Sequence, residues 1–211
     1  MKVFIIGTGN VGTAMATAAV AAKNDVAIFS TSLEKSKVAA EKSGAKVVGS
    51  LAEGVKDAEL VVLAVPGSAV ASLAEELKPI VGGQAVVDGT NPLNQTYTDL
   101  AYKGESGAAD LQALLPGVSV VKAFNTLFAG RYSTPSQKGT KLQIFIAGQD
   151  AEAKALVGKY AESMGFEAVD IGGLRLAKSM EEMAFLNISL NASQSLSWQS
   201  AWSLSGPEKL A

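Results

Sequence analysis

The chain alternates short apolar runs with longer amphipathic or alanine-rich segments from its first residues onward. The apolar runs have the length of strands, and several are apolar at every position, as in strands buried on both faces of a parallel sheet. The segments between them carry helix-forming residues at helical spacing. This pattern predicts an α/β fold of the Rossmann type, with a doubly wound, mainly parallel sheet and helices on both faces.

The order of the predicted elements follows directly from this pattern. Strands are expected at residues 2–6, 25–29, 46–48, 59–65, 84–88 and 118–122, and a last β-α-β unit adds strands at 141–147 and 166–170. Helices are expected at 10–22, 33–43, 68–78, 151–164 and 176–196. Residues 91–116 are polar and contain glycine, which predicts a long loop with one helical turn at 110–115.

The last predicted helix carries five apolar residues at helical spacing: Met180, Met183, Leu186, Ile188 and Leu190. An apolar stripe of this kind predicts an amphipathic helix that packs on the same domain or on a second subunit. We therefore expect a NAD(P)-binding Rossmann domain at 1–172 and a helical extension at 173–211, with a homodimer as one arrangement of that extension. We interpret the two methionines as core residues in preference to cofactor contacts.

A glycine-rich motif, Gly7-Thr8-Gly9-Asn10-Val11-Gly12, lies directly between the first predicted strand and the first predicted helix. In this position the first glycine permits the tight turn, the second admits a pyrophosphate to the backbone, and the third allows close packing of helix and strand. The free N–H groups and the positive end of the helix dipole then face the anion. We expect a dinucleotide here, rather than a glycine-rich turn without a ligand.

The second predicted strand ends in three hydroxyl residues, Ser30, Thr31 and Ser32, followed by Lys35 and Lys37. Enzymes that prefer NAD place a carboxylate at this point to accept hydrogen bonds from the ribose. Hydroxyl and ammonium groups instead suit the 2′-phosphate of NADP(H), which a carboxylate would repel. The same hydroxyls could also cap the following helix, and the two roles are compatible.

The 211-residue chain contains neither histidine nor cysteine, and its formal net charge is −2. Thiol chemistry, disulfides and the commonest metal ligand and general base are therefore absent, and no metal site is expected. The weak negative charge gives no field that would attract nucleic acid. No apolar segment has the length of a signal peptide or membrane span, so we expect a cytoplasmic protein without a membrane partner.

Several further motifs resemble those of one known group, the coenzyme F420:NADP oxidoreductases and the related NADPH-binding oxidoreductase domain of the STEAP ferrireductases. The resemblance runs nearly end to end. After the glycine motif it rests on LAVP at 63–66, DGTNPL at 88–93, KAFNT at 122–126, AGQD at 147–150, GF at 165–166 and DIGGL at 170–174. The chain departs from many members at 30–32, where they carry Ser-Arg, and at Gly173, where they carry proline.

This resemblance implies a set of binding roles along the cofactor. It places the pyrophosphate on Thr8, Asn10 and Val11, within the glycine turn from Gly7 to Gly12. The 2′-phosphate would lie on Ser30, Thr31, Ser32 and Lys35. The nicotinamide half would lie near Val65, Pro66, Asn91 and Ala123, with Phe124, Asn125 and Thr126 positioning the nicotinamide and the acceptor ring.

The residue inventory favours hydride exchange with a flavin-like partner. Such transfer needs two rings face to face at about 3 to 3.5 Å and no obligatory side-chain acid, whereas carbonyl reduction usually requires a proton donor. Lys122, Lys178 and the tyrosines are the candidate donors, and we interpret each first as a packing residue. Trp198 and Trp202 receive no role.

The predicted function is an NADPH-dependent oxidoreductase that moves a hydride between NADP(H) and a deazaflavin (F420) or flavin (FMN or FAD) acceptor. Two alternatives remain open. One is a non-catalytic NADPH-binding module that senses redox state, and the other is a small imine or carbonyl reductase. The imine and hydroxy-acid reductases that share this N-terminal fold add a large helical domain, for which about 40 residues after the Rossmann unit leave little room.

Overall fold

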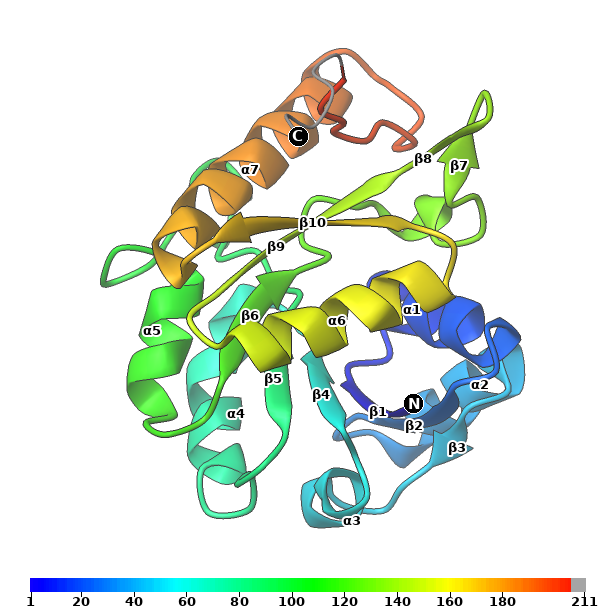
Figure 1. The fold of residues 1–211 in the computed structure, drawn as a ribbon, viewed down its shortest axis with the longest axis vertical. Coiled ribbons are helices and arrows are strands. Elements are labelled where there is room, and N and C mark those ends of the chain that lie inside the picture. The colour runs from blue at the N-terminus through cyan, green and yellow to red at the C-terminus, as the bar shows by residue number, and fades with distance from the viewer. Residues whose placement is uncertain (206–211) are drawn as a thin grey trace.

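Eight strands form one central sheet in the computed structural model, which describes residues 1–205 (Figure 1). The sheet order is β10-β9-β6-β5-β4-β1-β2-β3. Neighbours from β3 to β6 are parallel, β9 is antiparallel to β6, and β10 is parallel to β9. The strands are β1 (Lys2–Ile6), β2 (Asp25–Phe29), β3 (Lys46–Val47), β4 (Leu60–Leu63), β5 (Ala85–Asp88), β6 (Val120–Ala123), β9 (Gln143–Gly148) and β10 (Glu167–Gly172).

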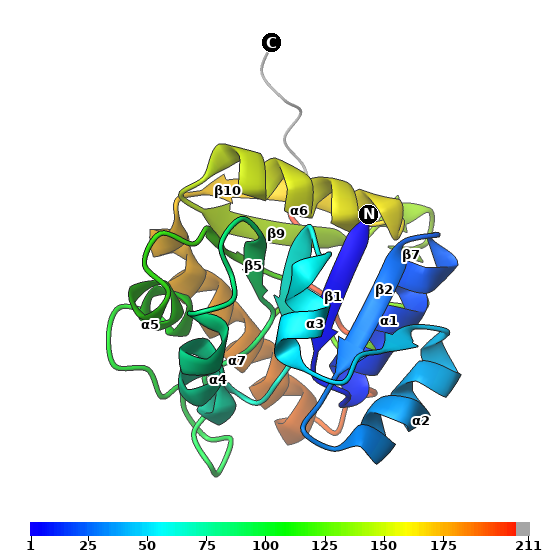
Figure 2. The same ribbon diagram turned by 90° about the horizontal axis from the view of Figure 1, so that it is seen from below.

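Helices cover both faces of this sheet (Figures 1 and 2). Helices α1, α2 and α6 pack on one face, and α3, α4 and α5 pack on the other. The last helix, α7, lies beside α5 and over β9. The helices are α1 (Asn10–Ala21), α2 (Leu33–Ser43), α3 (Leu51–Lys56), α4 (Val70–Leu77), α5 (Gly107–Leu114), α6 (Ala151–Ser163) and α7 (Ala177–Ser193), with short 3-10 turns η1 (Gly67–Ala69), η2 (Ala129–Arg131) and η3 (Leu174–Leu176).

Burial on both faces of the sheet explains the continuous apolar runs. In β1, Val3 and Ile5 belong to the core under α1 and α2, whereas Phe4 and Ile6 belong to the core under α3 and α4. All four are at most 3% exposed. Because successive side chains of a strand alternate between faces, only a strand covered on both sides is apolar throughout. The predicted doubly wound Rossmann fold is confirmed.

Three local elements differ from the predictions. Helix α5 begins at Gly107 rather than within 110–115, because Ser106 caps it by accepting a hydrogen bond from the N–H of Ala109 at 3.0 Å. Helix α3 was not predicted, although two side-chain bonds fix its start: Ser50 accepts from the N–H of Glu53 at 3.2 Å, and Glu53 accepts from the N–H of Gly49 at 2.7 Å. The hairpin of β7 (Ser136–Gln137) and β8 (Thr140–Lys141) was also not predicted.

The prediction for the packing face of α7 is wrong in part. Leu186 and Leu190 are 49% and 42% exposed, so they do not face the domain. The buried face instead includes the polar residues Glu181, Asn187 and Asn191. Specific polar partners, rather than an apolar stripe, therefore select the inward face. Packing of α7 on a second subunit stays a prediction, and residues 206–211 of the expected extension lie outside the described residues.

A buried ionic cluster connects α7 to the sheet. The ammonium group of Lys122, at the end of β6, lies 3.0 Å from Asp88 Oδ2 and 2.9 Å from Glu181 Oε1, and it donates to the carbonyl oxygen of Thr90 at 2.7 Å. The side chains of Lys122 and Glu181 are fully buried, and that of Asp88 is 1% exposed. We call Lys122, Asp88 and Glu181 the ionic triad.

Each carboxylate of the ionic triad has further donors. Asp88 Oδ1 accepts hydrogen bonds from the N–H and hydroxyl of Thr90, and Glu181 accepts from the N–H groups of Gly107 and Ala108 in the first turn of α5. These bonds and the positive end of the α5 dipole offset the excess negative charge. Burial lowers the pKa of Lys122, but the two carboxylates outweigh it and leave that pKa raised. The lysine therefore stays charged in the folded protein.

Removal of the central lysine should destabilise the fold severely. Lys122→Met leaves two carboxylates buried without their common cation, and we expect a loss of about 3–5 kcal/mol in the free energy of unfolding, measured by urea denaturation. The control is Lys46→Met, which removes an exposed ion pair with Asp25 (2.8 Å) and should change stability little. Equal losses in the two variants would contradict the account of the triad.

Candidate functional site

The glycine turn lies at the point where the strand order reverses, between β1 and β4. Open α/β sheets bind ligands at such a switch point, beyond the carboxyl ends of the strands. Gly7 has φ +123°, and a Cβ atom on it would overlap the carbonyl oxygen of Ala64; a Cβ on Gly12 would overlap the carbonyl oxygen of Gly7. Both glycines are therefore required by the turn itself.

Gly9 differs from the other two glycines because open space surrounds it. A Cβ on Gly9 would meet no atom within 4 Å, and the residue serves as the N-cap of α1 with extended backbone. Within residues 1–205, no side chain caps this helix, so the N–H groups of its first turn remain available to donate hydrogen bonds to another acceptor. The turn thus has the features of an anion-binding site, and the space for the anion lies beside Gly9.

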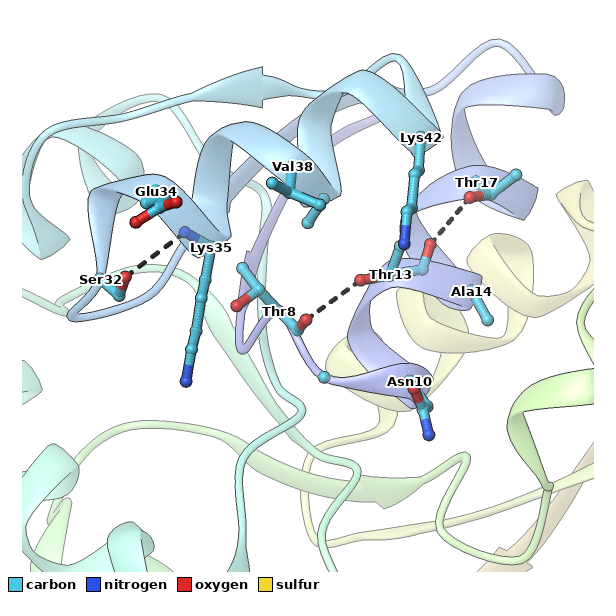
Figure 3. A pocket seen from close by; sticks show the side chains of 12 residues that line it. Thr8, Asn10, Thr13, Ala14, Thr17, Ser32, Glu34, Lys35, Val38 and Lys42 are labelled. Atoms are coloured by element: carbon cyan, nitrogen blue, oxygen red, sulfur yellow. Dashed lines mark hydrogen bonds between the residues drawn. The ribbon is translucent and has the colours of Figure 1, made fainter.

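Three cavities adjoin this turn and share residues with one another. The first, of about 640 Å³, lies between α1 and α2 (Figure 3). Its walls include Thr8, Gly9, Asn10, Ser32 and Lys35. Ser32 also caps α2 by accepting a hydrogen bond from the N–H of Lys35 at 3.4 Å. The capping role and the place in the cavity wall therefore occur together.

The second cavity, of about 520 Å³, continues from Gly9 and Asn10 across the carboxyl ends of β4 and β5. Val65 and Pro66 line it after β4, and Asn91 lines it after β5. The loop that follows β5 forms the outer wall and includes Tyr97, whose side chain is 69% exposed and whose φ is +58°.

The third cavity, of about 160 Å³, lies at the far end, where β6 meets α7. It shares Val11, Gly89 and Asn91 with the second cavity. Its other walls are Phe124, Asn125, Thr126, Leu127, Phe128, Ala184, Asn187 and Ile188. The three spaces form one trough, which we call the cofactor trough, from Lys35 through the glycine turn to α7.

Asn125 presents an unused hydrogen-bond acceptor at this far end. Its amide nitrogen donates to Asn91 Oδ1 at 2.9 Å and to the carbonyl oxygen of Met180 at 3.0 Å, while the Asn91 amide donates to the carbonyl oxygen of Asn125 at 2.9 Å. Asn125 Oδ1 is buried and has no partner among the described residues, and the residue is 6% exposed. A buried acceptor without a donor is costly, which makes this oxygen a candidate to accept a hydrogen bond from a ligand.

The backbone before Asn125 is held in a rare conformation. Phe124 has φ +68°, in the left-handed region that residues other than glycine seldom adopt. Its ring is 1% exposed and packs edge-on against Tyr160 at 5.6 Å. The ring is therefore anchored in the core, and it is the backbone turn that directs Asn125 toward the cavity. Strain of this kind persists where the surroundings enforce it, often at functional sites.

Comparison with known proteins agrees with this arrangement. Residues 2–92 match the family model described as NADP oxidoreductase, coenzyme F420-dependent. The F420-dependent NADP reductase of Methanothermobacter marburgensis is 29% identical over 208 residues, which cover 90% of this chain and 92% of that protein. The chain is therefore similar to the F420-dependent NADP oxidoreductases over nearly its whole length, and the resemblance drawn from its motifs is confirmed.

Two further similar proteins differ in how much of their own length the chain covers. The rat Metalloreductase STEAP3 is 32% identical over 189 residues, 85% of this chain, but the chain spans only 36% of that protein. A crystal structure from Arthrobacter sp. FB24, assigned provisionally as an F420-dependent NADP-reductase, superposes with a TM-score of 0.81 at 26% identity and covers 93% of this chain and 96% of that one. These similarities support an NADP-dependent oxidoreductase.

The structure brings most of the predicted site residues of this oxidoreductase to the cofactor trough. They are Thr8, Gly9, Asn10, Val11, Ser32, Lys35, Val65, Pro66, Asn91, Phe124, Asn125 and Thr126. Gly7 and Gly12 lie inside the turn, and Ala123 is buried in the core. Ser30 and Thr31 are outside the lining of the described cavities; Ser30 donates to the carbonyl oxygen of Ser32 at 2.9 Å.

The candidate proton donors are placed elsewhere in the fold. Lys122 belongs to the ionic triad, and Lys178 lies 5.9 Å from the centre of the Tyr102 ring. Tyr132 and Tyr160 are buried in the core, where burial raises the pKa of each phenol. Within residues 1–205, no group of three or more histidine, cysteine, aspartate and glutamate side chains could hold a metal ion. Lys122 is therefore held by ion pairs and the two tyrosines by burial, whereas Lys178 is exposed beside Tyr102.

Sequence reasoning missed three parts of the cofactor trough. The α7 residues Ala184, Asn187 and Ile188 carry no motif, and the loop residues up to Tyr97 lie in a segment that predicts only a long connection. Lys42 has a recoverable signal, because it lies seven positions after Lys35 and so on the same helix face. Among residues 1–205, every helix is too short or too polar to cross a membrane.

Gly9→Asp should abolish dinucleotide binding while leaving the fold intact. The space around Gly9 accommodates a side chain, but a carboxylate there would face the pyrophosphate, and we expect a loss of at least about a hundredfold in NADPH affinity, measured by calorimetry. The matched control is Gly82→Asp, which also enters open space but lies away from the trough. Unchanged affinity in Gly9→Asp would contradict the assignment of the turn.

Proposed function

We propose that this chain transfers a hydride between NADP(H) and the deazaflavin coenzyme F420. The observation that carries the proposal is the cofactor trough, which starts at a cationic, hydroxyl-bearing end, passes an uncapped helix N-terminus and finishes at the unpartnered oxygen of Asn125. Relatives of similar length bear the name F420-dependent NADP reductase, and they support the choice of acceptor.

Each part of the cofactor trough matches one part of NADP(H) in this proposal. The N–H groups at Asn10 and Val11 would hold the pyrophosphate, and Ser32 with Lys35 would hold the 2′-phosphate. Val65, Pro66 and Asn91 would contact the ribose on the nicotinamide side. The carboxamide of the nicotinamide has N–H donors, which are the groups that Asn125 Oδ1 lacks.

The preference for NADP(H) over NAD(H) rests on charge at the carboxyl end of β2. An NAD site of this fold uses an acidic side chain there, and residues 30–33 are instead Ser-Thr-Ser-Leu. Glu34 follows in the first turn of α2, where its carboxylate is favourable to the helix dipole. The 2′-phosphate thus meets hydroxyl and ammonium groups at the strand end.

The chain's own residues contribute position rather than acid–base groups. NADPH supplies the hydride when bound, and water supplies the proton that the reduced acceptor takes up. The protein has to hold the nicotinamide in one orientation and exclude water from one face of the ring. Asn125 would fix the carboxamide, and Val11, Ala184 and Ile188 offer apolar surface at the small cavity. Correct alignment can supply about 7–11 kcal/mol of barrier reduction in well-oriented reactions.

An acceptor assay tests the proposed reaction. NADPH oxidation is followed at the nicotinamide absorbance under anaerobic conditions, with F420 and with FMN in parallel. We expect rapid consumption of NADPH with F420, because the matching family model is described as F420-dependent. Heat-treated protein and protein without acceptor are the controls.

Each other outcome of this assay leads to a different function. Turnover with FMN alone would contradict the F420 assignment and indicate a flavin reductase on the same scaffold. Turnover with an imine or a carbonyl compound alone would indicate a small reductase of that class. NADPH binding without turnover on any of these acceptors would indicate a module that binds the dinucleotide and acts on a protein partner.

A further inference from the structure

One face of α2 forms a wall of the first cavity. The residues on it are Lys35, Val38, Ala39 and Lys42, which are spaced as one helical face. Figure 3 shows the side chains of Lys35 and Lys42 projecting from α2 toward the same side, where Thr8 and Thr13 lie. Lys37 is absent from this wall. The α2 lysine that joins Lys35 is therefore Lys42 and not the nearer Lys37.

The opposite wall of the cavity belongs to α1, and two of its hydroxyl groups already donate within the helix or to the turn before it. Thr13 already donates its hydroxyl hydrogen to the carbonyl oxygen of Thr8 at 3.2 Å, and Thr17 donates to that of Thr13 at 2.8 Å. An anion in this cavity therefore cannot depend on the α1 hydroxyls. Ser32 is different, because its hydroxyl accepts from the N–H of Lys35 and can still donate to a ligand.

The charge balance of the cavity favours a phosphate. Among residues 1–205, the ion pairs involve neither Lys35 nor Lys42, so no carboxylate within that part of the chain neutralises them. Glu34 is the one carboxylate in the cavity wall, and in Figure 3 it lies beside Ser32, on the other side of Lys35 from Thr13. A phosphomonoester carries a charge of about −1.5 to −2 at neutral pH, which a single ammonium does not balance.

We propose that Lys42 acts with Lys35 as a second cation for the ribose 2′-phosphate and so determines the preference for NADP(H). The inference rests on the proposed function, since it requires the adenosine end of NADP(H) in the first cavity. Residues 30–32 of this chain contain no arginine, and Lys42, about two turns after Lys35 along α2, offers a second positive charge. The ligand chemistry recognised is a nucleotide phosphomonoester.

The test compares three single variants of the intact chain: Lys42→Gln, Lys35→Gln and the control Lys37→Gln, which removes the same charge outside the cavity wall. Dissociation constants are measured by calorimetry for NADPH, NADH, 2′,5′-ADP and 5′-AMP. We expect Lys42→Gln to weaken NADPH and 2′,5′-ADP about three- to tenfold and to change NADH and 5′-AMP less than about twofold.

The outcomes separate this inference from the proposed function. Equal affinities for NADPH in Lys42→Gln and Lys37→Gln, with loss only in Lys35→Gln, would overturn the role of Lys42 and leave the proposed function standing. Loss of NADH and NADPH binding to the same extent would overturn the phosphate specificity of the site. Failure of the unaltered protein to bind any of the nucleotides would overturn both proposals.

Discussion

The buried ion pairs of Lys122 hold together the part of the structure on which the far end of the cofactor trough depends. One ammonium group joins the end of β5 through Asp88, the following loop through Thr90, and α7 through Glu181. Glu181 in turn receives the first N–H groups of α5. Lys122 of β6 thus contacts the end of β5, the loop after it and α7 directly, and α5 through Glu181, and each of these buried partners is hydrogen-bonded.

This cluster explains why α7 turns polar residues toward the domain. Desolvating a glutamate and a lysine is costly unless both are paired and hydrogen-bonded, so the pairing fixes the rotation of the helix. With α7 in that rotation, Met180 offers its carbonyl oxygen to Asn125, and Asn187 faces the small cavity. The leucines at 186 and 190 remain on the outer surface as a consequence.

The same constraint relates structure to chemistry. The ionic triad fixes the ends of β5 and β6. Asn91 and Asn125 follow these two strand ends, and each donates a hydrogen bond from its side-chain amide to the other residue. Phe124 accepts a rare backbone conformation because its ring is held in the core. The result is one rigid, unpartnered oxygen next to a cavity of about 160 Å³. A reaction that depends on ring alignment requires a fixed site of this kind.

Much of the fold could be predicted from the sequence because its determinants are local. The apolar runs of β1 and β4, the glycine turn and the cap at Ser32 are each encoded within a few residues. The orientation of α7 could not be predicted, because Lys122 and Glu181 are 59 positions apart and their pairing exists only in the folded chain. For the same reason the pattern identified Asn125 as a site residue but not its unsatisfied oxygen, which is a property of the packed neighbours.

The most direct test of the central claim is a crystal structure of the protein with NADP+ bound. The account predicts the nicotinamide in the small cavity beside Val11 and α7, with its carboxamide nitrogen about 3 Å from Asn125 Oδ1 and its pyrophosphate at the first turn of α1. A nicotinamide outside this cavity, with Asn125 Oδ1 still lacking a donor, would contradict the account.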